Sequence, residues 1–169
     1  MMRIGLDVGS TTLKCVVLNE QNEVLFKKYE RHLSRIVEKS VEMLREVAEQ
    51  FPKEKVLLSI SGSAGMGLAE RSDIQFVQEV YATRIAVNRL VPGTDAVIEL
   101  GGEDAKIIYF EGGNIEQRMN GICAGGTGSF IDQMASLLQT DATGLNEYAK
   151  HYHCLLYTSP SPRDTERSR

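Results

Sequence analysis

Several features that would point to other classes of protein are missing from this sequence of 169 residues. Its three cysteines stand at wide, irregular spacing, which argues against a disulfide framework and leads us to expect a cytoplasmic protein. The formal net charge of −4 gives no reason to expect nucleic acid or an anionic membrane as a partner. No apolar run approaches the length of a membrane span, and Asp7 interrupts the apolar start too early for a secretory signal.

What is present is the composition of a globular protein, with 42% hydrophobic and 25% charged residues. The stretch 154–169 is an exception, because it contains two of the four prolines, no glycine and no apolar periodicity. It resembles the translation of a cloning or sequencing adapter. We therefore interpret 154–169 as a non-native or disordered tail and exclude it from the fold prediction.

The first part of the chain shows a regular alternation of strand and helix patterns. Short apolar runs predict strands at 3–8, 13–18, 23–29 and 56–61. Apolar residues at three- and four-residue steps predict helices over 33–51 and 78–90, and the glycine-rich stretch 62–67 is expected to be a flexible turn. This β-β-β-α-β-α order predicts a mixed sheet covered by helices, a complete subdomain over residues 1–91.

The same order of elements begins again after Pro92-Gly93. Strands are expected at 96–100, 106–110 and 115–119, followed by a glycine-dense segment and a helix over about 128–138. The pattern ends before a second subdomain is finished. We therefore expect residues 92–153 to form the start of a truncated second subdomain.

The strongest chemical signal is the motif DVGSTTLK, which starts at Asp7 and lies at a tight turn between two expected strands. A glycine there lets the backbone approach a phosphate closely, and the neighbouring N–H and hydroxyl groups can surround it. Asp7 is available for a magnesium ion or its waters. The expected phosphate-binding residues are Gly9, Ser10, Thr11, Thr12 and Lys14. An ordinary β-hairpin turn remains the alternative, and the P-loop pattern is absent.

A second motif, ELGGEDAK, starts at Glu99 and repeats the design of strand, acidic residue, glycine turn and strand. Here the candidate site residues are Glu99, Gly101, Gly102, Glu103, Asp104 and Lys106. A Gly-Gly hairpin with solvated charges is the alternative. Each of the two turns opens a β-β-β-α unit, however, and this matching placement favours two turns that grip phosphates from both sides.

Together with NGICAGGTGSFIDQMA, these motifs resemble the BadF/BadG/BcrA/BcrD ATPase family of the acetate kinase–sugar kinase–Hsp70–actin superfamily. The resemblance runs from about residue 3 to residue 153. It implies an α/β, actin-like ATPase fold in which a ribonuclease H-like motif is duplicated, with the first half complete and the second half partial.

The resemblance also implies a function, the activation of a 2-hydroxyacyl-CoA dehydratase or a benzoyl-CoA reductase-like system by ATP-driven electron transfer. Its expected cofactors are ATP or ADP, Mg²⁺ and a [4Fe–4S] cluster that bridges a homodimer, and its electron donor would be a ferredoxin or flavodoxin. Asp7 and Asp104 would organise Mg²⁺ around the β- and γ-phosphates, with Glu99 as a third acidic residue. Cys123 would bind the cluster, although a lone cysteine among small residues is also typical of a buried thiol.

The sequence departs from the family pattern in three respects. The second cluster cysteine and the adenosine-binding motif are not found in this chain, and Cys154 is a poor substitute because it opens the tail. Glu99 and Glu103 stand where the family often has aspartate and glutamine. We therefore expect the chain by itself to be inactive, with part of its apolar surface uncovered.

Two other functions stay open. One is a sugar kinase of the same superfamily, similar to N-acetylglucosamine kinase, and the other is a non-catalytic nucleotide-binding partner protein. Glu79 stands where superfamily members often place an acidic or amide group near the attacking water, but a solvated helix face is the favoured interpretation. Cys15 is expected in the core, and no metal geometry is expected for His32, His151 or His153.

Overall fold

The computed structural model describes residues 1–111, 114–119, 125, 127–151 and 153. The chain divides into two compact units, Met1–Ser129 and a second that begins at Phe130. The predicted subdomain boundary near residue 91 stays a prediction. None of the helices in the described part of the chain is long and apolar enough to cross a membrane.

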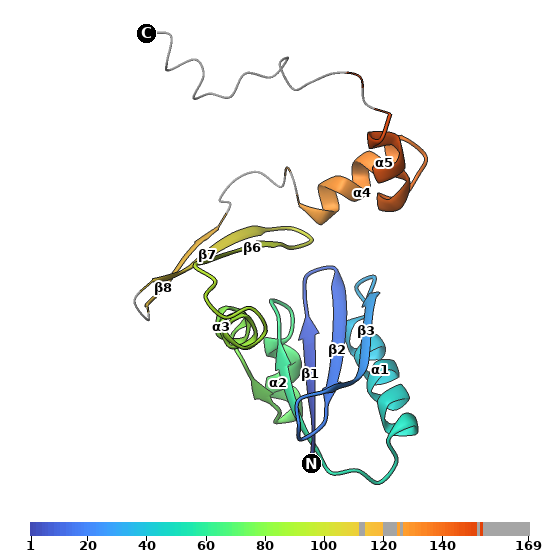
Figure 1. Cartoon of the computed structure of the whole chain (residues 1–169). Helices are drawn as coiled ribbons and strands as arrows, with labels where there is room; N and C mark the ends of the chain where they lie inside the picture. The colour runs from blue at the N-terminus through green and yellow to red at the C-terminus, as the bar shows by residue number, and fades with distance from the viewer. Residues whose placement is uncertain (112–113, 120–124, 126, 152, 154–169) are drawn as a thin grey trace. The chain divides into compact units, whose positions relative to one another are not determined.

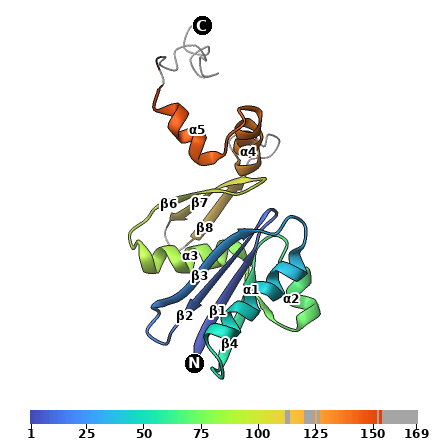
Figure 2. The same ribbon diagram turned by 90° about the vertical axis from the view of Figure 1, so that its right-hand side faces the viewer.

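The first unit contains two sheets (Figures 1 and 2). The five-stranded sheet has the order β3-β2-β1-β4-β5, in which β1 pairs antiparallel with β2 and parallel with β4. Its strands are β1 (Met2–Val8), β2 (Thr12–Leu18), β3 (Val24–Arg31), β4 (Val56–Ser61) and β5 (Gln75–Phe76). The second sheet is antiparallel, with the order β6 (Ala96–Leu100), β7 (Ala105–Glu111) and β8 (Asn114–Met119).

Helices α1 (Ile36–Gln50), α2 (Met66–Ser72) and α3 (Glu79–Leu90) accompany the first sheet, as Figure 1 shows. Two more helices follow the second sheet in the chain, α4 (Gly128–Leu137) and α5 (Ala142–Ala149).

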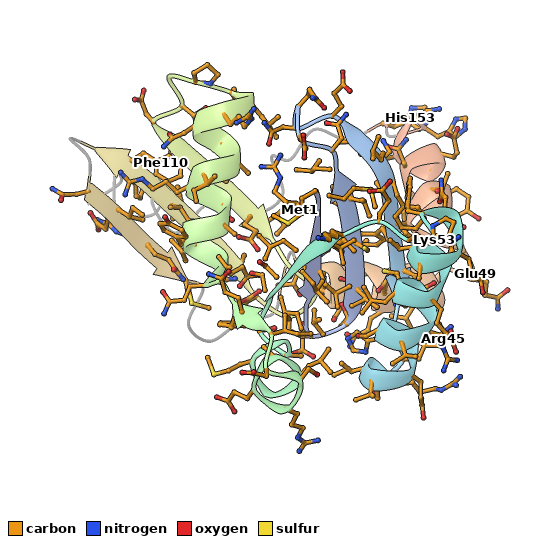
Figure 3. All side chains as sticks on the ribbon, turned by 90° about the horizontal axis from the view of Figure 1, so that it is seen from below. Met1, Arg45, Glu49, Lys53, Phe110 and His153 are labelled. Carbon is orange, nitrogen blue, oxygen red and sulfur yellow. The ribbon has the colours of Figure 1, made fainter. Side chains whose placement is uncertain are left out.

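The core lies between the first sheet and helices α1 and α2. Met43 and Val47, one turn apart on α1, are buried against the inward-facing residues of the strands. Arg45 and Glu49 lie on the outer side of the same helix (Figure 3). The core residues are Met2, Ile4, Leu6, Val8, Leu13, Cys15, Val17, Met43, Val47, Ile60 and Ala69. The prediction that Cys15 lies in the core is therefore confirmed.

The alternation of side chains along β1 decides where its polar residues point. Leu6 and Val8 are buried in the core, so Asp7 between them points to the opposite face at the end of the strand. Lys14 is its direct partner on β2. The fold thus places this acid–base pair on the open face beside the β1–β2 turn.

Two of the predicted elements differ from the structure. The helix expected over 33–51 begins only at Ile36, because Leu33 and Ser34 have positive φ angles of 49° and 63°. The stretch 62–67 is a turn only up to residue 65, and α2 begins at Met66. The glycines on either side of Met66 lower the helix propensity of this segment, but burial of Ala69 against the core stabilises the helix. The short strand β5 was also not predicted.

Candidate phosphate-binding site

The first predicted motif forms the turn between β1 and β2. Val8 and Leu13 are the last cross-strand pair, and the Gly9 N–H donates to the Thr12 carbonyl at 2.9 Å. The Lys14 ammonium lies 2.8 Å from Asp7 Oδ2. Both side chains are about one-third exposed, 39% for Lys14 and 32% for Asp7, so a ligand can reach them.

Gly62, in the stretch predicted to be a flexible turn, packs closely against Asp7. Gly62 has a φ of +95°, and a Cβ built on it would lie 2.3 Å from the Val8 carbonyl oxygen and 2.5 Å from Asp7 Oδ1. No other residue fits there, because the backbone after β4 approaches the end of β1 too closely. The sequence around Gly62 indicates only a glycine-rich turn. The residues that make glycine obligatory there, Asp7 and Val8, belong to another strand.

The second predicted motif forms the turn between β6 and β7. The Gly101 N–H donates to the Asp104 carbonyl at 2.8 Å, and Glu99 and Lys106 are cross-strand partners. Two carbonyls of this turn are bonded to the start of α4. The Gly128 N–H donates to Gly101 at 2.9 Å, and the Ser129 N–H donates to Gly102 at 2.8 Å.

Lys106 is buried among three carboxylates, with only 6% of its side chain exposed. Its ammonium lies 2.6 Å from Glu79 on α3, 3.6 Å from Asp104 and 3.7 Å from Glu99. Burial by itself would lower the pKa of Lys106, but the hydrogen bond to Glu79 and the surrounding carboxylates raise it above its usual value. Glu79 therefore belongs to this cluster and does not merely lie on a solvated helix face.

The same surroundings act on Glu99. Burial raises the pKa of its carboxyl group, the negative charges of Glu79 and Asp104 raise it further, and Lys106 opposes them. One oxygen of this side chain, Glu99 Oε2, is buried without a hydrogen-bond partner in the described part of the chain. The carboxylate is therefore held in a site that favours an additional positive charge.

The two turns meet. A Cβ built on Gly102 would lie 2.3 Å from the Thr11 hydroxyl oxygen, so the second turn lies directly against the first. Together they line a cavity of about 30 Å³, which holds only about one or two water molecules. The lining residues are Gly9, Ser10, Thr11, Thr12, Lys14, Ser63, Glu79, Glu99, Gly101, Gly102, Asp104 and Lys106. Entry of phosphate groups therefore requires the two turns to separate.

The charges around this cavity fit a divalent cation. The carboxylates of Asp7, Glu79, Glu99 and Asp104 outnumber the ammonium groups of Lys14 and Lys106 by two. Asp7 Oδ1, like Glu99 Oε2, is buried without a partner among the described residues. Magnesium characteristically takes one or two carboxylates and completes its shell with water and phosphate oxygens. Among the described residues, no group of three or more His, Cys, Asp or Glu side chains is arranged to hold a metal ion.

The prediction that a cysteine binds an iron–sulfur cluster is not tested by the described residues. Cys123 lies outside the described residues, so its role as a cluster ligand stays a prediction. Cys15 is buried, and desolvation, followed by the nearby Glu46 carboxylate, raises its pKa to about 11. A thiol that resists ionisation in this way is unsuited to binding iron.

His32 is a contact residue of the first turn to which the sequence analysis gave no role. It is 3% exposed, its ring Nε2 lies 3.0 Å from the Gly9 carbonyl oxygen, and its main-chain N–H donates to the Thr11 carbonyl. The sequence places His32 directly after a strand, but nothing in it indicates contact with Gly9 or Thr11, which lie about 20 residues earlier in the chain.

Comparison with known proteins identifies relatives of the whole described region. The (R)-2-hydroxyglutaryl-CoA dehydratase activating ATPase of Acidaminococcus fermentans is 29% identical over 155 residues, which cover 85% of this chain and 56% of the relative. The crystal structure of component A of the (R)-2-hydroxyglutaryl-CoA dehydratase from the same organism superposes with a TM-score of 0.78 and 27% identity. That match covers 99% of this chain and 66% of the other.

A second solved structure is the activator of the 2-hydroxyisocaproyl-CoA dehydratase from Clostridium difficile with bound ADPNP. Its TM-score is 0.74 at 26% identity, with coverage of 95% of this chain and 60% of the other. The chain thus spans less than two-thirds of the length of these proteins, and the expected mixed α/β, actin-like ATPase fold is confirmed. The model of the BadF/BadG/BcrA/BcrD ATPase family matches residues 4–153, and the chain therefore belongs to that family.

Proposed function

We propose that this chain provides the phosphate-binding part of an ATPase that activates a 2-hydroxyacyl-CoA dehydratase, or a related reductase, by driving electron transfer. The single observation that carries the proposal is the meeting of the two turns. Residues far apart in the sequence, Thr11 and Gly102, are in contact, and both turns line one cavity with two lysines and several carboxylates.

Each group around the cavity has a role in holding ATP. The hydroxyl groups of Ser10, Thr11 and Thr12 and the backbone of Gly101 and Gly102 hold the phosphates. Lys14 leaves its pairing with Asp7 to offset phosphate charge, and this frees the Asp7 carboxylate. Catalysis of phosphoryl transfer depends mostly on such positioning and on electrostatics.

The acidic residues would hold Mg²⁺. Asp104 lines the cavity, and Asp7 lies beside it, paired with the cavity-lining Lys14. Asp7 and Glu99 each offer a buried oxygen that has no partner among the described residues. When bound there, Mg²⁺ would supply positive charge that offsets the charge of the phosphates. Lys106 keeps Glu79 in place at the start of α3, from where its carboxylate can orient the attacking water.

The second turn of the phosphate site is hydrogen-bonded to the start of α4. The start of α4 is hydrogen-bonded to the Gly101 and Gly102 carbonyls, and Cys123 lies shortly before α4 in the chain. A movement of the second turn when phosphate is bound or released therefore acts on the start of this helix. This coupling is how ATP hydrolysis would influence a [4Fe–4S] cluster held in part by Cys123.

The proposed partners follow from the relatives. Proteins named as activators of 2-hydroxyglutaryl-CoA, 2-hydroxyisocaproyl-CoA and lactoyl-CoA dehydratases are each about 30% identical to this chain. We propose that the protein acts as a homodimer in the cytoplasm and takes electrons from a ferredoxin or flavodoxin. The particular acyl-CoA substrate is left open.

The test is to purify, without air, the product of the complete open reading frame that contains residues 4–153. We expect a brown, oxygen-labile protein that hydrolyses ATP and activates a dehydratase. Asp7→Asn should abolish hydrolysis and keep the iron, whereas Cys123→Ser should lose the iron and keep nucleotide binding. Cys15→Ala is the matched cysteine control and should keep both. A colourless, iron-free dimer would contradict the activator function.

The same preparation discriminates the other two functions. A sugar kinase would phosphorylate an amino sugar or polyol, and Cys123→Ser would leave that activity unchanged. A non-catalytic partner protein would bind nucleotide in calorimetry without releasing phosphate.

A further inference from the structure

His32 binds the first turn through both its ring and its backbone. The residue follows β3 directly and is buried, with 3% of its surface exposed. Ring Nε2 lies 3.0 Å from the Gly9 carbonyl oxygen, and the main-chain N–H donates to the Thr11 carbonyl oxygen at 3.3 Å. A single residue from the neighbouring strand thus binds two carbonyls of the turn.

The hydrogen bonds determine the tautomer of the ring. The Ser34 N–H donates to His32 Nδ1 at 3.2 Å, so Nδ1 must present its lone pair. The Gly9 carbonyl can only accept, so Nε2 must carry the hydrogen. The ring is therefore a neutral imidazole that donates from Nε2 to the phosphate turn.

A strained turn keeps the ring in this position. Leu33 and Ser34 both have positive φ angles, 49° and 63°, which residues other than glycine rarely adopt. Leu33 is 74% exposed, so packing of its side chain does not impose this conformation. What closes the turn is a pair of hydrogen bonds to His32, the Ser34 N–H to Nδ1 and the Arg35 N–H to the carbonyl at 2.8 Å.

Holding a carbonyl also fixes the direction of the next amide. In a trans peptide the C=O and the following N–H point in opposite directions, and this chain has no cis peptide bond among its described residues. The bond from Gly9 to His32 therefore turns the Ser10 N–H away from His32. The bond from Thr11 turns the Thr12 N–H away in the same manner. Ser10 and Thr12 line the cavity, and His32 does not.

The second turn has the same arrangement with different donors. Its Gly101 and Gly102 carbonyls accept from the Gly128 and Ser129 N–H groups at the start of α4. By the same geometry, the N–H groups of Gly102 and Glu103 point away from the Gly128 and Ser129 N–H groups. In both turns, therefore, the carbonyl oxygens accept hydrogen bonds on the side away from the proposed phosphates. This leaves the backbone N–H groups directed toward the anion, as anion binding by backbone N–H groups requires.

We propose that His32 is a positioning residue of the phosphate site: its Nε2–H holds the Gly9 carbonyl so that the Ser10 amide faces the phosphates, and its main-chain N–H holds the Thr11 carbonyl so that the Thr12 amide does the same. The inference rests on the phosphate-binding part of the proposed function. His32 does not touch the ligand. It acts through the backbone of the turn. The Asp7 side chain remains available to hold Mg²⁺, and the Lys14 side chain remains available to offset the charge of the phosphates.

Two substitutions separate the functions of the ring. In His32→Gln the amide Nε2 is as many bonds from Cβ as the ring Nε2, so it can still donate to Gly9. In His32→Asn the Oδ1 takes the place of Nδ1 and can accept from Ser34 in an Asx turn, but nothing donates to Gly9. Each variant keeps one of the two ring hydrogen bonds, so each is the matched control of the other.

The probe is Mg²⁺–tripolyphosphate, titrated into the 169-residue chain in a calorimeter. We expect His32→Asn to weaken binding about five- to tenfold, the equivalent of one lost hydrogen bond, and His32→Gln to bind within about twofold of the wild type. In the wild type, imidazole ¹⁵N shifts should place the hydrogen on Nε2.

Each result has a distinct meaning. Equal binding by the wild type and both variants, or equal loss in both variants, would overturn the role of His32 and leave the phosphate site standing. A ring hydrogen on Nδ1 would also overturn it. A wild-type chain that does not bind the probe would refute the phosphate site and this inference together.

Discussion

Replacing Gly102 by alanine tests the contact between the two turns. The new Cβ would lie 2.3 Å from the Thr11 hydroxyl oxygen and 3.0 Å from its methyl carbon, so Thr11 must move or the turns must separate. Overpacking of this kind costs about 1–3 kcal/mol. Alanine regains about 0.4–1 kcal/mol by restricting the unfolded chain, so we expect a net loss of about 1–2 kcal/mol. The assay is urea unfolding followed by far-ultraviolet circular dichroism, since the chain has no tryptophan.

A second substitution on the other side of the contact identifies the cause. Thr11→Ala removes both atoms closest to the new Cβ, so the double variant should recover most of the loss, with a coupling of about 1–2 kcal/mol. Gly5→Ala is the control, because no atom lies within 4 Å of its added Cβ, and we expect a gain of about 0.5–1 kcal/mol. If Gly102→Ala is as stable as Gly5→Ala, or if Thr11→Ala gives no relief, the turns do not meet in solution.

Three further predictions concern strain and titration. Leu33→Gly should raise the free energy of unfolding by about 0.5 kcal/mol. A left-handed conformation costs a non-glycine residue about 1–2 kcal/mol, and glycine avoids this cost. Part of the gain, about 0.5–1 kcal/mol, is lost because glycine makes the unfolded chain more flexible. The exposed helical Val37→Gly should instead destabilise in the same urea experiment. Since the pKa of Cys15 is raised from 9.0 to about 11, the unfolded thiol ionises first, so stability should fall between those pH values, and Cys15→Ala should abolish this slope. The pKa of Glu99 is also raised, so its ionisation opposes folding. Glu99→Gln should therefore stabilise the chain at pH 7 and reduce the gain in stability as the pH falls toward 4.5.

The sequence was most informative where local geometry decides the structure. The DVGSTTLK and ELGGEDAK motifs each lie at a turn between antiparallel strands, as predicted, because a glycine turn between two apolar runs specifies a hairpin. The matching order of elements around them also led to the expectation that the two turns cooperate. The contact of Gly102 with Thr11 and the shared cavity are consistent with it.

Features that depend on residues distant in the sequence could not be predicted. That Lys106 binds phosphate stays a prediction, but its ion pair with Glu79, which is on a different element, was not predicted. Gly62 is obligatory because Val8 approaches it from another strand. The delayed start of α1 follows from a turn closed by hydrogen bonds to His32. In each case a tertiary contact overrides or adds to the local pattern.

The most direct test of the central claim, that two separate turns form one phosphate site, is a residue-resolved amide NMR titration. Mg²⁺–tripolyphosphate is added to the ¹⁵N-labelled chain, and the amides of Ser10 and Thr12 are compared with those of Gly102 and Glu103. We predict that all four amides shift along one binding curve with a single Kd, because both turns line the same cavity. Shifts confined to one turn, or two curves with different Kd values, would contradict the account.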